Sequence, residues 1–389
     1  MAKSTACLPG AAALVVALLA GGCAAPDGSA PEAPRPGVRA AVRQLVTAGE
    51  APGAAALSRD RRGTWFGSAG VADLRNDRRM GAGDRFRAGS VTKIFVATVV
   101  LQLVAEGRLG LTDTVDDHLP GLVRGNGNDG RRITVRQLLS HTSGLFNYTE
   151  DPELKRVVFG RGFAEHRLDA YSPERLVRVA LRHAPRFRAG SGYHYSNTDY
   201  ILLGLVVEEV TGRRYAEEVQ RRIVRPLALT GTSFPGTRPT LPGPHGRAYS
   251  TASAPPGAPK RKMDVTALDP SSAGAAGEAV STLGDLSRFL RALLGGRLLP
   301  PEQLRRMRDT SGTQGAYGLG LFPVRLPCGR TLWGHNGSIN GSYVQTLGTA
   351  DGSHVLSYRV NTDAVGDERA ETRLLEAEFC PPAGTRPPR

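Results

Sequence analysis

The 389-residue chain carries 40% hydrophobic and 22% charged residues, a balance typical of a globular protein with a substantial core. Its formal net charge of +14 raises the question of a nucleic-acid partner. The basic residues are scattered along the chain, and no aromatic-rich binding module accompanies them, so we expect no nucleic-acid binding. The simplest interpretation of the excess positive charge is the arginine bias of a GC-rich genome, and the alternative is affinity for the anionic polymers of a cell wall.

The chain begins with the layout of a secretory signal, residues 1–23. Lys3 precedes an apolar run at 11–20 that is too short to span a bilayer. Cys23 follows "LLAGG", which is similar to a lipoprotein cleavage site. We therefore expect a protein that is either secreted or anchored to the outer face of the cell membrane by a lipid on Cys23. Residues 24–37, rich in Pro and Ala, are expected to form a flexible spacer.

Export would place the remaining cysteines in an oxidising compartment, where they can pair. Only Cys328 and Cys380 are left once the leader and Cys23 are set aside. We expect them to form one disulfide that closes the last part of the fold. Two unrelated buried thiols are the alternative.

The first half of the chain changes from strand patterns to helix patterns. Residues 55–71 show apolar blocks broken by "DRRG", which predicts two strands joined by a turn. Directly after Ser90, apolar residues recur at helical spacing until Gly107, so a buried helix is expected there. Further helices are predicted at 172–184, with Ser172 as the N-cap, and at 197–212.

The second half returns to strands. A long irregular stretch at 234–262 is expected to be a surface loop, and a helix is predicted at 281–296. Three stretches with alternating or continuous apolar residues are then predicted to form strands: 316–326, 330–337 and 341–362. The last of them contains a hairpin signal at Asp351-Gly352. A final helix is predicted at 371–380.

This order predicts one α+β domain over 38–381, followed by a disordered tail at 382–389. Its antiparallel sheet would be built from both ends of the chain, about 38–85 and 275–381, and flanked by helices. A mostly helical region at about 86–274 would be inserted between the two parts of the sheet.

Ser90 and Lys93 form the pattern that points to chemistry. Residues three apart at a helix start lie on one face, with Cβ atoms roughly 5 to 6 Å apart. Only five of the 50 basic residues are lysine, and an amine can give up its proton when it is buried, whereas a guanidinium cannot. A serine hydroxyl needs such a neighbour to become a nucleophile. The alternative is that Ser90 only caps the helix and Lys93 extends to solvent.

Two later stretches strengthen the catalytic interpretation. "YHYSNTDY" places Tyr195 and Asn197 before a predicted helix, and "GHNGS" places His335, Gly337 and Ser338 at the end of a predicted strand. Glycine at such a position permits close backbone approach.

Taken together, Ser-x-x-Lys, Tyr-Ser-Asn and His-x-Gly resemble the serine β-lactamase and DD-peptidase family, in particular the class C β-lactamases and the secreted actinomycete D-alanyl-D-alanine carboxypeptidases. Further stretches that carry the likeness are "ITVRQLLSHTSGL", "YGLGL" and "EAEFC", so it extends from about residue 38 to Cys380.

The resemblance implies an acyl-enzyme mechanism without metal or cofactor. Ser90 would attack a carbonyl, and Lys93 and Tyr195 would share the proton transfers; which of the two is the base stays open. Lys93 and His335 would supply the positive charge that a tyrosine base needs.

The remaining motif residues would bind the substrate. Asn197, His335, Gly337 and Ser338 would line its site, and the backbone N–H groups of Ser90 and Ser338 would form the oxyanion hole.

The substrate is less well defined by these patterns. The arginine that holds a terminal carboxylate in related peptidases aligns with Phe322, and Arg325 would face the other way on an alternating strand. We expect a monomeric D-alanyl-D-alanine carboxypeptidase acting on peptidoglycan-type peptides. An esterase or weak β-lactamase is the first alternative, and a receptor that β-lactams acylate without turnover is the second.

Other hydrolase chemistries find less support. No G-x-S-x-G elbow, H-E-x-x-H or C-x-x-C motif occurs in the chain. "GNGNDG", residues 125–130, matches the pattern G-x-G-x-x-G of nucleotide-binding loops. It follows no predicted strand and is interpreted as a loop. His141, in "LLSHTSGL", is interpreted as structural.

Overall fold

The computed structural model describes residues 35–48, 51–251 and 262–380. The predicted signal, Cys23, most of the spacer, part of the 234–262 loop and the predicted tail lie outside these residues. Within the described ranges, no helix is both long enough and apolar enough to cross a membrane.

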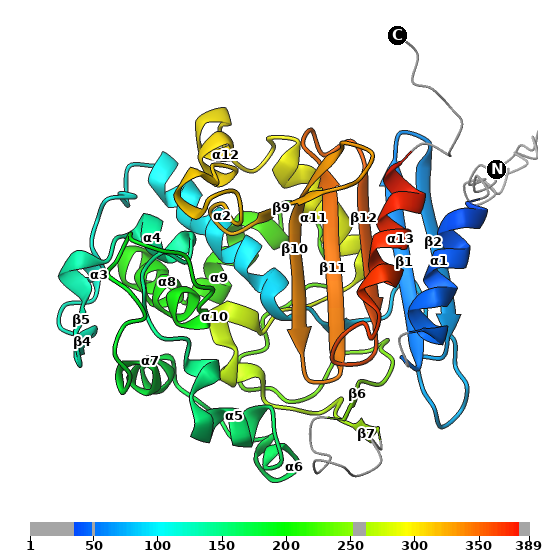
Figure 1. Ribbon diagram of the computed structural model, residues 1–389, viewed down its shortest axis with the longest axis horizontal. Coiled ribbons are helices and arrows are strands. Elements are labelled where there is room, and N and C mark those ends of the chain that lie inside the picture. Colours follow the sequence, from blue (N-terminus) through cyan, green and yellow to red (C-terminus); the bar gives the residue numbers. More distant parts are fainter. Residues whose placement is uncertain (1–34, 49–50, 252–261, 381–389) are drawn as a thin grey trace, which may run out of the picture. The chain divides into compact units, whose positions relative to one another are not determined.

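A six-stranded antiparallel sheet joins the two ends of the described chain. Its strand order is β2-β1-β12-β11-β10-β9 (Figure 1), which confirms the predicted α+β fold. The two N-terminal strands form a hairpin, and β1 pairs along its other edge with the last strand. The strands are β1 (Gly53–Asp60), β2 (Gly63–Gly70), β9 (Phe322–Arg325), β10 (Thr331–Ile339), β11 (Ser342–Thr349) and β12 (Val355–Val360).

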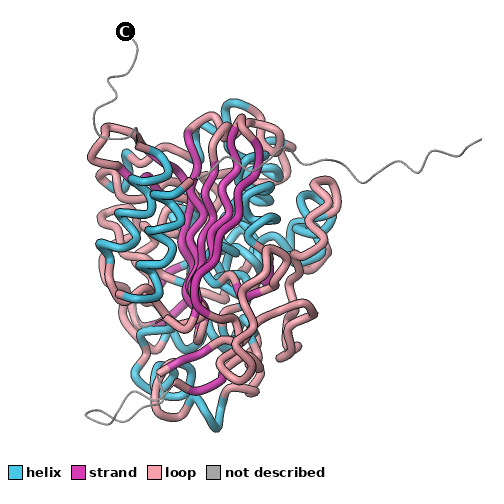
Figure 2. Tube along the Cα trace, turned by 90° about the vertical axis from the view of Figure 1, so that its right-hand side faces the viewer, coloured by secondary structure: helices cyan, strands magenta, loops and turns pink. Residues whose placement is uncertain are grey.

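Helices cover both faces of this sheet (Figure 2). On one face, α1 (Pro36–Thr47) and α13 (Glu368–Phe379) pack against each other and the strands. On the other face, α11 (Leu283–Leu294) packs against the central strands. Strand positions are therefore buried on both sides, which explains why β12 is apolar or buried throughout.

Helix α1 was not among the predicted elements, and its first two residues fall in the range expected to be spacer. It begins at Pro36, which suits the first position of a helix. Its buried residues recur at i, i+3, i+4 and i+7, the stripe of an amphipathic helix: Val38, Ala41, Val42 and Leu45.

The helical region is organised around two buried helices, α2 (Thr92–Ala105) and α8 (Asn197–Thr211), which pack against each other. Most residues of both are buried, so they are apolar all round rather than amphipathic. The surrounding helices are α3 (Val115–His118), α4 (Val135–Leu139), α5 (Pro152–Val158), α6 (Phe163–His166), α7 (Pro173–Leu181), α9 (Tyr215–Val219), α10 (Gly274–Gly277) and α12 (Pro301–Met307).

Short elements fill the connections. The predicted loop at 125–130 contains a small hairpin of β4 (Arg124–Gly125) and β5 (Asn128–Asp129). The other short strands are β3 (Phe86–Arg87), β6 (Tyr249–Ser250), β7 (Met263–Asp264) and β8 (Val280–Ser281), and the short helical turns are η1 (Gly89–Val91), η2 (Gly130–Arg132), η3 (Tyr148–Glu150), η4 (Gln220–Val224), η5 (Pro270–Ser272) and η6 (Ser311–Thr313).

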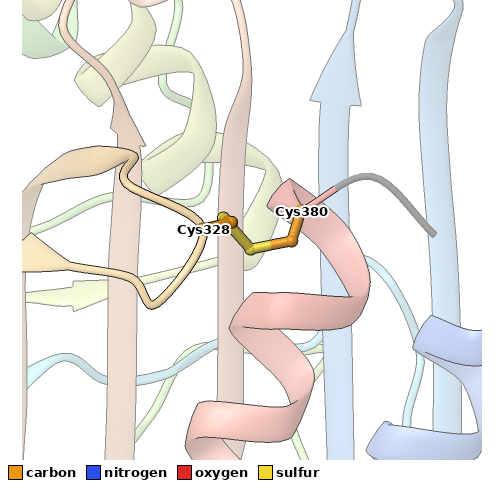
Figure 3. The surroundings of a disulfide bond; sticks show 2 residues. All are labelled: Cys328 and Cys380. Carbon is orange, nitrogen blue, oxygen red and sulfur yellow. A yellow bond between two sulfur atoms is a disulfide. The ribbon is translucent and has the colours of Figure 1, made fainter. Parts of the chain in front are cut away.

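Cys328 and Cys380 are joined by a disulfide (Figure 3). It links the turn between β9 and β10 to the end of α13, and the two cysteines are 52 positions apart in the chain. The bond thus ties the β9 edge of the sheet to α13, which covers one face of the sheet.

We expect Cys328→Ser to lower the free energy of unfolding by about 2–4 kcal/mol, because the open chain regains the entropy of a long loop. Chemical denaturation of the oxidised protein and the variant measures this difference. Unchanged unfolding midpoints for the variant and for dithiothreitol-treated protein would contradict the expected stabilisation.

Candidate active site

Ser90 and Lys93 lie where the short turn η1 runs into α2. Gly89 precedes them with a φ of +52°, a conformation that favours glycine. The Lys93 side chain is 0% exposed, and its Nζ lies 3.1 Å from Ser90 Oγ. Lys93 therefore does not extend to solvent, and its amine faces the hydroxyl that the Ser-x-x-Lys pattern predicted.

Two carbonyl groups complete the surroundings of the Lys93 amine. Nζ donates to Asn197 Oδ1 and to the backbone oxygen of Ala276, each at 2.7 Å. A neutral amine has two hydrogens and one lone pair, and carbonyl oxygens can only accept. With both hydrogens used by the carbonyls, the lone pair is directed to the remaining neighbour, the Ser90 hydroxyl. This is the arrangement that a general base requires.

Burial acts in the same direction as the hydrogen bonding. It lowers the pKa of Lys93 well below its usual value, and the nearby Asp199 opposes the shift. Burial raises the pKa of Tyr195 above its usual value, while a hydrogen bond with Ser90 works in the opposite direction. Hydrogen bonding and burial thus both favour a neutral amine, and burial favours a neutral phenol, beside the same serine.

His335 does not supply positive charge, contrary to the expectation from the motifs. It is 1% exposed, and burial together with Lys93 lowers its pKa to about 3. Its Nδ1 is bonded to the carbonyl oxygen of Asn336, and its Nε2 lies 2.8 Å from the hydroxyl of Tyr317. The imidazole is thus neutral. Tyr317 comes from the "YGLGL" stretch, which the motif analysis quoted without assigning it a role.

The backbones of η1 and β10 meet closely beside Ser90. A Cβ placed on Gly337 would lie 1.9 Å from Ala88 O and 2.9 Å from Ser90 N, and one on Gly89 would lie 2.8 Å from Ser338 N. Glycine is required at both positions because any side chain would collide with the opposite backbone. The approach brings together the two N–H groups that the resemblance assigned to an oxyanion hole.

Asp363 holds the loop at this end of β10, and the motifs did not indicate it. Its carbonyl oxygen accepts the hydroxyl of Ser338 at 2.6 Å. Its carboxylate accepts the N–H of Gly341 at 2.6 Å and the hydroxyl of Ser250 at 2.8 Å.

A cavity opens beside Ser90. Of the predicted residues, Ser90, Asn197 and Ser338 line it, whereas His335 does not and instead contacts Tyr317. Part of the lining is apolar or aromatic, and no sequence motif pointed to these residues: Tyr148, Val158, Phe159, Phe163, Tyr171, Leu268 and Ile339.

Four ionisable side chains line the cavity: His166, Arg167, Asp169 and Asp269. Phe322 and Arg325 are not among its lining residues. Phe322, at the position where a carboxylate-binding arginine was expected, lies with its ring centroid 5.0 Å from that of His335. Arg325 is exposed at the end of β9. Arg167 lines the cavity, while His166 is paired with Asp169 at 2.8 Å.

Solved structures similar to this chain include two amide hydrolases. A D-stereospecific amidohydrolase from Streptomyces sp. is 48% identical, with a TM-score of 0.80 over 88% of this chain and 98% of that one. The D-amino acid amidase from Ochrobactrum anthropi SV3, complexed with D-phenylalanine, is 27% identical, with a TM-score of 0.75 over 88% and 97% of the two chains.

Curated relatives carry penicillin-binding names. Penicillin-binding protein 4 from Amycolatopsis lactamdurans is 29% identical over 334 residues, which cover 78% of this chain and 81% of that protein. The putative penicillin-binding protein PbpX from Bacillus subtilis is 26% identical over 237 residues, and this chain spans only 53% of its length.

The family model described as Beta-lactamase matches residues 38–379, nearly the whole described domain. The match contains the buried amine at the nucleophile, the Tyr-Ser-Asn loop and the glycine contact between η1 and β10. The chain therefore belongs to the beta-lactamase family, within the serine β-lactamase and penicillin-binding protein superfamily of serine hydrolases.

Proposed function

We propose that this protein is a D-stereospecific amidohydrolase that cleaves amides and short peptides through an acyl-enzyme on Ser90. The observation that carries the proposal is the hydrogen bonding of Lys93, whose two carbonyl partners leave its lone pair for Ser90. The similarity to the Streptomyces amidohydrolase supports amides as the substrate class.

The proton transfers follow from the neutral states of the two groups on Ser90. As Oγ bonds to the acyl carbon, its proton passes to Lys93 Nζ. The leaving amine takes the proton of the Tyr195 hydroxyl, and Lys93 returns a proton to Tyr195. Water then attacks the ester by the same route in reverse and releases the acid. The N–H groups of Ser90 and Ser338 would stabilise the oxyanion in both steps.

The cavity favours an acyl group with a bulky apolar side chain. Phe159, Phe163 and Ile339 offer an apolar wall beside the nucleophile. Phe322 replaces a cation on the His335 side of the site, so that side suits a neutral leaving group better than a free carboxylate.

D-Alanyl-D-alanine carboxypeptidase activity is the second candidate. Arg167 lines the cavity and has no side-chain hydrogen bond or ion pair in the described structure, so its guanidinium is available to a substrate carboxylate. The penicillin-binding names of the curated relatives also favour this candidate.

Export is part of the proposal as well. Residues 1–23 would direct export, and the exported protein would be either released or held at the membrane by a lipid on Cys23. The intact mass of protein purified from membranes distinguishes these two forms, because lipidation at Cys23 removes the leader and adds acyl chains.

We expect D-phenylalanine amide to be hydrolysed at least about tenfold faster than its L enantiomer, because the two enantiomers cannot place both the scissile amide and the side chain alike and the similar Streptomyces enzyme is D-stereospecific. Ammonia release measures both rates. Equal rates, or a preference for the L enantiomer, would contradict D-stereospecific hydrolysis.

The same protein should release little D-alanine from a diacyl-L-Lys-D-Ala-D-Ala peptide. Fast release that Arg167→Ala reduces, with ammonia release from D-phenylalanine amide unchanged, would replace the first proposal with the second. A single stoichiometric burst with all substrates would instead indicate a receptor without turnover.

Lys93→Arg should slow acylation of Ser90 by at least about 100-fold, since a guanidinium keeps its charge and cannot accept the serine proton. Fluorescent penicillin labelling measures acylation, with Ser90→Ala as the unlabelled reference. Lys155→Arg, at an exposed lysine of α5, is the matched control and should label normally. Normal labelling of Lys93→Arg would exclude the amine as the base.

A further inference from the structure

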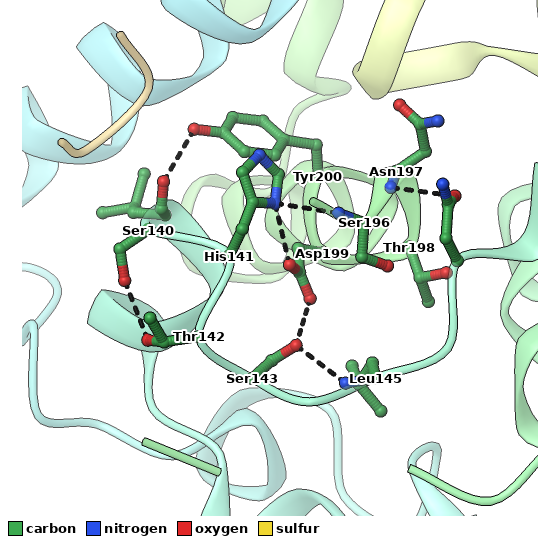
Figure 4. A network of polar contacts seen from close by, with 12 residues as sticks. Ser140, His141, Thr142, Ser143, Leu145, Ser196, Asn197, Thr198, Asp199 and Tyr200 are labelled. Carbon is green, nitrogen blue, oxygen red and sulfur yellow. Dashed lines mark hydrogen bonds and ion pairs between the residues drawn. The ribbon is translucent and has the colours of Figure 1, made fainter. Parts of the chain in front are cut away.

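Beneath the catalytic residues lies a buried acid–imidazole pair that the mechanism above does not use. Asp199 is on α8, two residues after Asn197, and His141 follows α4 (Figure 4). Asp199 Oδ2 lies 2.9 Å from His141 Nδ1, and both side chains are 0% exposed. The other carboxyl oxygen accepts the hydroxyl of Ser143 at 2.5 Å.

His141 holds the segment that carries Tyr195 from both sides. Its backbone oxygen accepts the N–H of His194 at 3.1 Å, and its Nδ1 accepts the N–H of Ser196 at 3.3 Å. The imidazole also lies against the Tyr195 ring, with centroids 4.3 Å apart. Tyr195 is thus bracketed by one residue through its two neighbours and its own ring.

The backbone of His141 is itself constrained. Its φ of +58° is in the left-handed region, which non-glycine residues rarely adopt. Such a conformation persists only where the surroundings enforce it. The contacts with Asp199 and with the Tyr195 segment provide that enforcement.

The Nδ1 atom of His141 faces two groups at once. Asp199 Oδ2 lies 2.9 Å away and the Ser196 N–H lies 3.3 Å away. The shorter of the two contacts is the one to Asp199, so one shared proton joins the imidazole and the carboxyl group. The other ring nitrogen, Nε2, has no hydrogen-bond partner in the described structure.

Burial disfavours the charged form of both members of the pair. It raises the pKa of Asp199 well above its usual value. It lowers the pKa of His141 well below its usual value. The titratable groups that face the pair are Lys93 on α2, His194 and Tyr195 before α8, Tyr200 on α8, Tyr317 before β9 and His335 on β10.

We propose that Asp199 and His141 form a hydrogen-bonded positioning pair that holds the Tyr195 hydroxyl on Ser90. The pair touches no substrate and acts through Tyr195. The proposal deepens the proposed function and rests on its acylation step, but not on the identity of the substrate.

Asp199→Asn and Asp199→Leu separate hydrogen bonding by the pair from simple packing. An amide can bond to Nδ1 and accept from Ser143, whereas leucine can do neither. We expect Asp199→Asn to slow penicillin acylation less than about threefold and Asp199→Leu about 100-fold, the cost of a misplaced catalytic group.

The pH dependence of acylation gives a reading that packing alone would not change. If the pair acts through hydrogen bonds and not through charge, Asp199→Asn leaves the acidic limb of the rate profile where it is in the wild type. If Asp199 were ionised, its charge would raise the pKa of Lys93. Removing that charge would then move the acidic limb to lower pH, and a shift of one pH unit or more overturns the proposal.

His141→Asn tests the other half of the pair, since asparagine tolerates the left-handed backbone. We expect acylation to slow more than about tenfold, with a circular dichroism spectrum like that of the wild type. Ser140→Ala is the matched control, because Ser140 bonds to Arg136 and Thr142 but not to the pair.

The outcomes are separable from those of the substrate proposal. If penicillin acylates His141→Asn or Asp199→Leu at the wild-type rate, the positioning pair is overturned. It is also overturned if Asp199→Asn is acylated as slowly as Asp199→Leu. Failure to cleave D-phenylalanine amide, with penicillin labelling intact, overturns only the substrate class. Should Asp199→Leu not fold, Asp199→Asn and His141→Asn still decide the matter.

Discussion

The site depends on the removal of one lysine side chain from water. Lys93 is fully buried. The two oxygens that accept hydrogen bonds from its amine, Asn197 Oδ1 and the backbone oxygen of Ala276, carry no formal charge. A buried ammonium would lose much of its hydration without a directly bonded carboxylate to replace it. The amine is therefore held in its basic form, and the nucleophile next to it gains a proton acceptor that water-exposed lysine would not provide.

Three parts of the chain converge to create this environment. Helix α2 supplies the amine, the start of α8 supplies Asn197, and α10 supplies the carbonyl of Ala276. The sheet contributes from the opposite side through the glycine contact between η1 and β10. The burial of Lys93 and the glycine contact leave no space for additional atoms. Packing therefore keeps the Ser90 hydroxyl, the Lys93 amine and the Ser338 N–H group in one arrangement.

Much of this could be predicted from sequence because the relevant signals are local. The Ser-x-x-Lys spacing at a helix start places two side chains together whatever the rest of the fold does. The strand hairpin at β1 and β2, the N-cap of α7 at Ser172 and the C-cap of α8 at Gly212 are likewise encoded by neighbouring residues. The antiparallel sheet from both chain ends followed from the order of these patterns.

The remainder depends on tertiary contacts that no short pattern contains. His335 was expected to carry charge, but its burial against Tyr317 is visible only once β10 is in place. The amphipathic stripe of α1 was present in the sequence and was overlooked beside the Pro-rich stretch that precedes it. The cavity wall comes from segments with no shared spacing, and His141 gains its importance only through Asp199 and the Tyr195 segment.

The order of the strands has a consequence for the newly made chain. Ser90 and Lys93 leave the ribosome well before β10, whose Gly337 and Ser338 supply the facing backbone. Until the last strands insert between β1 and β9, the serine has its proton acceptor but lacks half of the groups that would stabilise a tetrahedral adduct. The two facing backbone segments therefore come together only when the C-terminal strands complete the sheet.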